Sequence, residues 1–292
     1  EMQRSLVGSE MCIRDRLTLY HCNFKGGIAM PAAYAHYTFG KKVLANIENP
    51  DIRRIITEHR ALFDIGLHGP DILFFYRPLK SNPVSKAGHL MHAEIVAPFF
   101  RQARRVINRS NDREASIAYI LGFICHYSLD SECHGYIREM TETGISHTEI
   151  ETEFDRSILL HCQKDPITTK TLSHIQVSKE ISNCIAQFFP AISEKEMFEA
   201  LKSFRFYNNF LISPCKVRRA VINAAFRLSG SYEELHGLVM NFHRNPDCAP
   251  ICRRLSHLYI EAIPVGVRLT ESFYNALSTG EPLEERFDRN FE

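Results

Sequence analysis

The chain has 292 residues, of which 45% are hydrophobic and 24% are charged, and this composition excludes disorder over most of its length. Lysine and arginine number 35 against 34 acidic residues, which excludes a protein that holds nucleic acid or an anionic membrane mainly through its net charge. No uninterrupted apolar run reaches the roughly 18 residues of a membrane-spanning segment. Any recognition of phosphate must therefore be local, and we expect no stable binding of nucleic acid.

Histidine and cysteine are the informative residue types in this composition, with 14 and nine copies. Neutral imidazole is the commonest nitrogen ligand of zinc, so the histidines suggest a metal site. The cysteines lack regular short spacings and we expect no secretory signal, so we also expect reduced core cysteines and a cytoplasmic location. Cys248 and Cys252 share a helical spacing that also occurs in metal sites, but two cysteines alone are more typical of a core.

The first 16 residues resemble translated sequencing-adaptor sequence, and we exclude them from the analysis of the fold. We expect residues 1–29 to be non-native adaptor-derived and upstream sequence, and residues 30–292 to form one helical domain. Translation from Met30 followed by removal of that methionine would leave Pro31 with a free amino group.

From Met30 onward the apolar residues recur at helical spacing without sustained alternation, so the predicted fold class is all-α, a single multi-helix bundle. Residues 67–88 contain several prolines and glycines and are predicted to form an irregular surface stretch. Four capping boxes, each with an acceptor three residues before a glutamate, predict helix starts at Asn111 with Glu114, Ser146 with Glu149, Ser193 with Glu196, and Ser231 with Glu234.

Residues 118–134 carry the strongest local pattern, because His126, Asp130 and His134 recur every four residues on an otherwise apolar helix. Four positions advance a helix by about 400°, so these side chains share one stripe about 80° wide. A bundle interior holds such polar groups only if they are paired, and a metal ion that all three bind would satisfy them. The alternative is a surface helix with a histidine–aspartate pair.

Other candidate ligands are weaker when taken singly. His147 and Glu151 lie four residues apart on a predicted helix, where such a pair is usually solvated. Asp71 follows Gly69-Pro70 and could simply cap a short helix. Further candidates are His36 near the proposed mature terminus and either His89 or His92, of which we favour His92.

Together and in order, these motifs resemble the zinc-dependent phospholipase C family over about residues 31–151. The resemblance implies an all-helical fold and a zinc cluster, which that family shares with the single-strand-specific zinc nucleases. It also implies one zinc among Asp71, His92, His126 and Asp130, a second among His134, His147 and Glu151, and a third at Pro31, His36 and Asp130. Two departures are the missing terminal tryptophan of the family and three residues, instead of five, between Asp130 and His134.

The implied activity is zinc-dependent hydrolysis of phosphate esters by a metal-bound hydroxide, with two or three zinc ions per chain and a phospholipid head group or other phosphodiester as substrate. Asp71 is the candidate general base. Phe74, Phe75 and Tyr76 could line a substrate pocket, although an aromatic run is more often core. Alternative interpretations are a nuclease-like phosphodiesterase and a non-catalytic protein whose zinc ions only stabilise the fold. The oligomeric state stays open.

Overall fold

A computed structural model describes residues 33–230 and 232–291 of the chain. Within them every regular element is a helix, which confirms the predicted all-α class. Pro31 and the Ser231 capping box lie outside the described residues. The first half contains α2 (Ala33–Asn46), α3 (Pro50–Glu58), α4 (Arg60–Gly66), the 3-10 helix η1 (Gly69–Phe75), α5 (Pro83–Ala93), α6 (Ala97–Arg109) and α7 (Arg113–Thr141).

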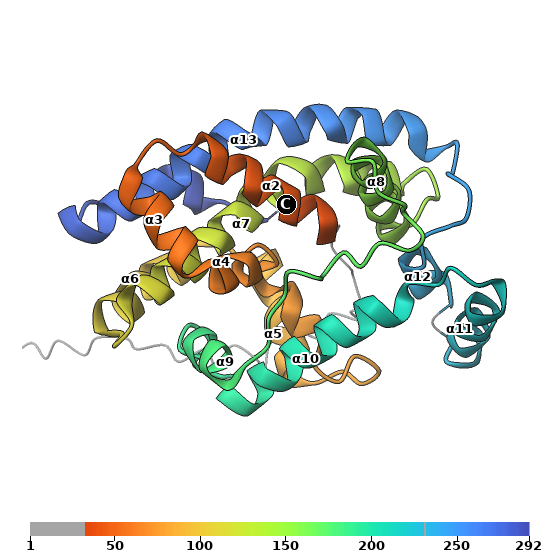
Figure 1. Ribbon diagram of the computed structural model, residues 1–292, viewed down its shortest axis with the longest axis horizontal. Helices are drawn as coiled ribbons and strands as arrows, with labels where there is room; N and C mark the ends of the chain where they lie inside the picture. The colour runs from red at the N-terminus through yellow and green to blue at the C-terminus, as the bar shows by residue number, and fades with distance from the viewer. Residues whose placement is uncertain (1–32, 231, 292) are drawn as a thin grey trace, which may run out of the picture.

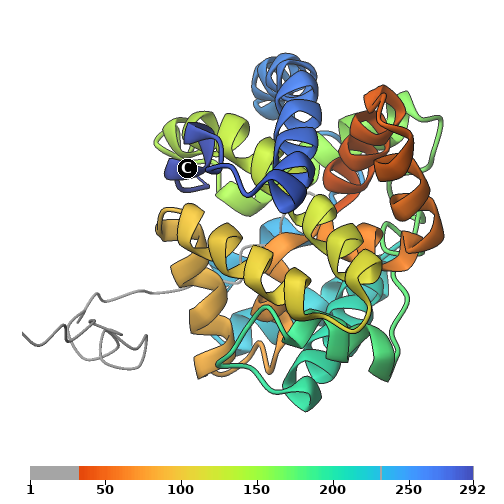
Figure 2. The same ribbon diagram turned by 90° about the vertical axis from the view of Figure 1, so that its left-hand side faces the viewer.

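The second half is also helical but contains longer connections. Its elements are α8 (His147–His161), α9 (Lys179–Ala186), α10 (Glu194–Leu211), α11 (Lys216–Leu228), α12 (Tyr232–Leu235), the 3-10 helices η2 (His236–Leu238) and η3 (Glu285–Asp288), and α13 (Cys248–Thr279). Figure 1 shows α13 along one long edge of the molecule and α9 and α10 along the other. Figure 2, turned by 90°, shows the same separation of α13 from α9 and α10.

Helix α7 is the centre of the fold, because all of its residues from Ala115 to Asp130 are buried. Helices α2, α3, α4, α6 and α13 pack around it. The close approach of α4 to α7 depends on Gly66 in α4 and Gly122 in α7, since a Cβ atom at either position would collide with the backbone of the other helix. The buried stripe of polar residues on α7 thus lies inside the bundle and not on a surface helix.

The capping signals are only partly correct. Ser193 and Glu196 form the predicted reciprocal box at the start of α10. Ser146 caps α8 as predicted, but the Glu149 carboxylate accepts a hydrogen bond from Asn245 instead of returning to the cap. The start of α7 is capped by Asp112, so the prediction of Asn111 was wrong by one residue.

The prediction of a surface stretch over residues 67–88 was wrong for its first part. Residues 67–76 are all buried, and η1 forms there because its apolar run, Ile72 to Phe75, can be covered by α5 and α10. The aromatic run from Phe74 to Tyr76 belongs to the core. Asp71 is therefore carried into the interior with this run.

Candidate metal centre

The α7 stripe and the start of α8 bring five of the predicted ligands together. On α7 the His126 Nε2 atom lies 3.0 Å from Asp130 Oδ2, and His134 Nε2 lies 3.5 Å from Asp130 Oδ1. On α8 His147 Nε2 lies 3.1 Å from Glu151 Oε1, which is also 3.6 Å from His134 Nε2. The helical spacing of four residues therefore produces the shared faces predicted from the sequence.

Asp130 is the centre of this arrangement, because its two carboxylate oxygens face different groups. Oδ1 lies 3.1 Å from His36 Nε2 on α2, in addition to its approach to His134. Oδ2 faces His126 and lies 3.9 Å from His92 Nε2 on α5. The Asp130 side chain is only 3% exposed. A carboxylate placed in this way can join two cation positions.

Asp71 and His92 complete the centre from η1 and α5. Asp71 Oδ1 lies 3.0 Å from His92 Nε2, and Asp71 Oδ2 lies 3.7 Å from His126 Nε2. The His92 Nδ1 atom donates to the Gly88 carbonyl at 2.9 Å, which leaves Nε2 directed at the acidic groups. Metal-bound histidines in proteins commonly show this outer hydrogen bond.

The donor atoms form three groups whose members lie within 4.8 Å of one another. They are His36 with His126 and Asp130, Asp71 with His92 and His126, and His134 with His147 and Glu151. His89, the alternative to His92, belongs to no such group of described residues and stacks on Phe74 with ring centroids 4.4 Å apart. The structure thus brings all the described candidate ligands together, and it favours His92 over His89 as the ligand from α5.

Unsatisfied polar atoms show that this donor set fits a bound cation. Five of its carboxylate oxygen and imidazole Nε2 atoms are buried and make no hydrogen bond, although oppositely charged or polar neighbours lie close by. Buried polar groups are normally hydrogen-bonded, so a cluster of exceptions requires an explanation. Imidazole nitrogen and carboxylate oxygen are together the donor chemistry of zinc. The atoms are Asp71 Oδ2, His126 Nε2, Asp130 Oδ2, His134 Nε2 and Glu151 Oε2.

The pKa values reflect the same concentration of charge. Burial raises the pKa of Asp130, but the imidazoles of His126, His134 and His36 outweigh burial and hold it well below its usual range. Burial also opposes ionisation of Glu151, yet His147 and His134 lower its pKa to about 2. Burial lowers the pKa of His92, whereas its bond to Asp71 raises it to about 9 overall. The Asp130 and Glu151 carboxylates are consequently ionised and attract cations.

Glycine at position 69 is required for the packing of His126. Gly69 has a φ of 45°, and a Cβ atom there would collide with the His126 ring. The His126 ring also stacks on His36, with centroids 4.5 Å apart. The Gly-Pro-Asp sequence therefore both positions Asp71 and leaves room for a ligand from α7.

Asp155 supports the centre in a way that the sequence pattern did not indicate. Its carboxylate accepts hydrogen bonds from the backbone amides of Tyr34 at 2.9 Å and Ala35 at 2.7 Å. It thereby satisfies donors in the first turn of α2, next to His36. The residues are 120 or more positions apart, so no local capping signal exists.

Phe291 is a second residue that the sequence analysis missed. It is fully buried, and its ring lies 4.8 Å from that of His92 and 5.7 Å from that of His126. Its backbone amide donates to the His92 carbonyl at 3.4 Å. Nothing in the sequence near Phe291 indicates that this side chain packs against His92 and His126, because Phe291 is apolar and belongs to no ligand motif.

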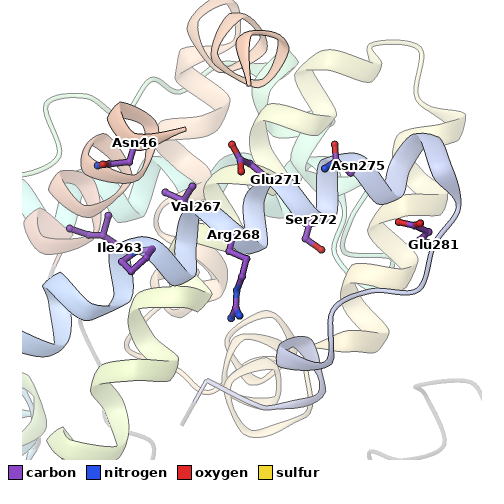
Figure 3. A pocket seen from close by; sticks show the side chains of 9 residues that line it. Asn46, Ile263, Val267, Arg268, Glu271, Ser272, Asn275 and Glu281 are labelled. Atoms are coloured by element: carbon purple, nitrogen blue, oxygen red, sulfur yellow. The ribbon is translucent and has the colours of Figure 1, made fainter. Parts of the chain in front are cut away.

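Two other features of the described residues do not belong to the centre. Glu58, His59 and Glu114 also form a group of potential ligands, but it is partly exposed and Arg54 pairs with both glutamates. A cleft of about 660 Å³ lies between the end of α2 and α13, where Arg268 and Glu271 line it. None of the candidate ligands lines this cleft (Figure 3).

The remaining cysteine predictions can be compared with the structure. The seven cysteines among the described residues are all unpaired. Cys248 and Cys252 are buried in α13 and join no group of three potential ligands within the described part of the chain. No helix in that part is both long and apolar enough to cross a bilayer.

Over the described residues, the chain is an all-helical bundle whose clustered histidine and carboxylate donors fit zinc binding. Residues 35–199, more than half of the chain, match the family model described as zinc dependent phospholipase C. The chain belongs to the zinc-dependent phospholipase C family. Searches of the curated proteins and of the solved structures found no match.

Proposed function

We propose that this protein is a zinc-dependent phosphodiesterase that hydrolyses the head-group ester of phospholipids. Membership of the zinc-dependent phospholipase C family supports the reaction class. The observation that carries the proposal is the position of Asp130, whose Oδ1 faces His36 and His134 and whose Oδ2 faces His126. One carboxylate in this position could be shared by two neighbouring cations, which would stabilise the attacking and leaving oxygens. The substrate class rests on the family.

The residues that would hold zinc are those that the fold brings together. One ion would lie among Asp71, His92, His126 and Asp130, and a second among His134, His147 and Glu151. A third would lie at His36 and Asp130, with Pro31, which lies outside the described residues, as the remaining ligand. Bound zinc would lower the pKa of water towards about 7 and stabilise negative charge on the phosphoryl oxygens.

The chain's own residues would position the substrate and move the proton. Asp71 Oδ2 is buried without a hydrogen-bond partner, so it is available to accept a proton from the attacking water. Asp71 Oδ1 lies 3.0 Å from His92 Nε2, so both atoms would face the same zinc, and the carboxylate would be fixed through Oδ1. The His147 side chain is 34% exposed and marks the side from which a substrate reaches the centre.

Hydrolysis of a soluble chromogenic phosphocholine ester tests this proposal. Turnover should be lost with a chelator and return with added zinc. Asp71→Asn should retain part of the zinc and lower the rate by about 100-fold or more, whereas Glu139→Gln, an exposed change on α7, should leave the rate unchanged. Chelator-insensitive turnover would rule out zinc chemistry, and a full rate in zinc-loaded Asp71→Asn would exclude Asp71 as the base.

A further inference from the structure

Helices α10 and α11 expose an unusual amount of apolar surface. Half of the ten large hydrophobic residues that are exposed in the described part of the chain lie between positions 206 and 228. They are Phe206 (61% exposed), Phe210 (41%), Val217 (71%), Val221 (63%) and Leu228 (90%). Single exposed apolar residues are normal, but a contiguous group of them marks an interaction site.

Helix α11 has two apolar faces, and the described residues cover only one of them. Ile222 and Phe226 pack into a small core with Leu235 and Leu238. At about 100° per residue, Val217, Val221 and Leu228 lie within about 40° of one another, on the side away from that core. Ala224 and Ala225 border the same exposed face. This face is an apolar stripe directed at solvent.

Basic residues flank the stripe on both sides. The chain from Lys202 to Gly230 contains six lysines and arginines and no acidic residue, although the whole chain has a net charge of only +1. Lys216 and Arg227 fall on one side of the stripe and Arg218 on the other, and all three are exposed. The positive charge is therefore local, as phosphate recognition by a nearly neutral chain requires.

The aromatic residues of α10 extend the same surface. The rings of Phe206 and Phe210 stack with centroids 6.1 Å apart. Arg218 of α11 lies over the Phe210 ring at 5.4 Å and donates to the Phe210 carbonyl at 2.7 Å, which joins the two helices. A hollow of about 450 Å³ is lined by these residues together with Lys202, Arg205 and Asn209.

We propose that this surface of α10 and α11 docks the protein on anionic lipid membranes. An interfacial helix buries an apolar face at the boundary of head groups and acyl chains while flanking lysines and arginines bind anionic head groups. Nucleic acid would engage the basic and aromatic residues but offers no apolar partner for Val217, Val221 and Leu228. The aliphatic stripe between basic flanks therefore favours a bilayer.

The docking surface is connected to the elements that form the metal centre. Phe204 of α10 packs against Phe75 of η1, the element that carries Asp71, with ring centroids 5.0 Å apart. On the other side Gly237 of η2 packs against Ser146 and Thr148 at the start of α8, which carries His147. If the proposed function holds, docking therefore places the catalytic domain next to its lipid substrate.

Vesicle flotation with the full chain tests the docking. Vesicles of phosphatidylcholine alone should bind weakly, and vesicles with phosphatidylglycerol added should bind strongly and lose binding with salt. Lys216→Glu with Arg227→Glu should weaken partitioning about tenfold or more. Val221→Ser with Leu228→Ser should weaken it by about tenfold as well, but should retain the salt dependence.

Matched variants separate docking from general effects. Arg101→Glu with Arg105→Glu changes two exposed arginines of α6, and Leu160→Gln with Ile260→Gln changes two exposed apolar residues elsewhere. Both pairs should bind vesicles like the parent chain. Thermal melting of every variant checks folding, and the substituted residues are exposed, so large losses of stability are not expected.

Equal binding by the parent chain and both surface variants would overturn the proposal, as would absence of binding to anionic vesicles. Retardation of single-stranded DNA that the same substitutions abolish, without vesicle binding, would assign the surface to nucleic acid instead. Hydrolysis of the soluble ester should be unaffected by the surface variants. A chain that floats with vesicles but has no esterase activity would retain the docking surface and disprove only the proposed function.

Discussion

The metal centre and the surface of α10 and α11 depart from the usual distribution of side chains in opposite directions. At the centre, the carboxylates are buried and the imidazoles are buried or half-buried, and several of their atoms have no hydrogen-bond partner. On α10 and α11, aliphatic and aromatic side chains are exposed beside lysines and arginines. Both arrangements cost free energy in the isolated chain, so each points to a missing partner: cations for the centre and a membrane for the surface.

The comparison also teaches how each partner is selected. The centre uses donors from five separate elements, which restricts the positions of bound ions. The surface uses one continuous stretch of two helices, where no individual contact needs a fixed geometry. We therefore expect substitutions at the centre to have large and position-specific effects, and substitutions on the surface to leave stability nearly unchanged.

The largest expected effect comes from comparing two neighbouring histidines of α5. His92→Asn removes a donor next to Asp71 and should lower turnover of the soluble ester by more than about 100-fold, since even outer partners of zinc-bound histidines contribute 10- to 100-fold. His89→Asn, three residues away, should change turnover by only a few-fold. Similar losses of turnover in both variants would contradict the assignment of His92, and not His89, as the metal ligand of α5.

A pair of glycines separates crowding at the centre from ordinary helix propensity. Gly69→Ala should reduce the free energy of unfolding by at least about 2 kcal/mol, because alanine is strained at positive φ and collides with His126. Gly135→Ala lies in open space on α7 and should stabilise the chain by about 0.5–1 kcal/mol. Denaturant unfolding measures both, and an unchanged midpoint for Gly69→Ala would contradict the described packing.

Asp155→Ala tests whether the support of α2 is needed for the His36 position. Loss of the acceptor for the Tyr34 and Ala35 amides should cost about 1–2 kcal/mol and should reduce the zinc bound per chain. Chemical unfolding and metal analysis measure the two effects. Unchanged stability together with full metal content would mean that α2 is held by its other contacts alone.

Asp155 should also contribute a pH dependence with a defined sign. Burial raises the pKa of Asp155 to about 7, above the value of about 4 expected in the unfolded chain. The folded state then binds the proton more tightly, so stability decreases as pH rises from about 4 to about 7. Asp155→Asn should remove this component. A wild-type stability curve that rises relative to that of the variant over this range would contradict the assignment.

The smallest effect is expected on the exposed surface. Leu228→Gln should change the free energy of unfolding by less than about 0.5 kcal/mol, because the side chain is 90% exposed and loses no buried contact. Thermal unfolding measures this directly. A large destabilisation would show that Leu228 is covered by another part of the protein in solution. The surface of α10 and α11 would then no longer count as exposed apolar surface.

The sequence predicted the features that follow from helical periodicity. The four-residue spacing on 126–134 required a shared face, and the apolar neighbours of that stripe required burial. His36, Asp71 and His92 were candidates that are ambiguous when taken singly, and the family resemblance grouped them with the other ligands. The proline and glycine content around Asp71 predicted a surface stretch, but the structure has a buried 3-10 helix there. Local sequence could not predict this burial, because it depends on packing against α5 and α10.

Other features were hidden because they depend on contacts distant in the sequence. Asp155 caps α2 across 120 or more residues, and Phe291 contacts His92 from the segment that follows η3, the last helix of the described chain. The stripe at Val217, Val221 and Leu228 has the same periodicity as a buried face, so only the structure distinguishes an exposed stripe from a core stripe.

Metal content per chain, measured by mass spectrometry on purified protein and on Asp130→Asn, tests the central claim most directly. Asp130 lies between the donor groups, so its loss should remove most of the bound metal, whereas Glu139→Gln should leave the content unchanged. We predict two or three zinc ions in the parent chain and chelator-sensitive ester hydrolysis. A folded parent chain that binds no zinc in the presence of excess zinc, or an Asp130→Asn variant with full metal content, would contradict this account.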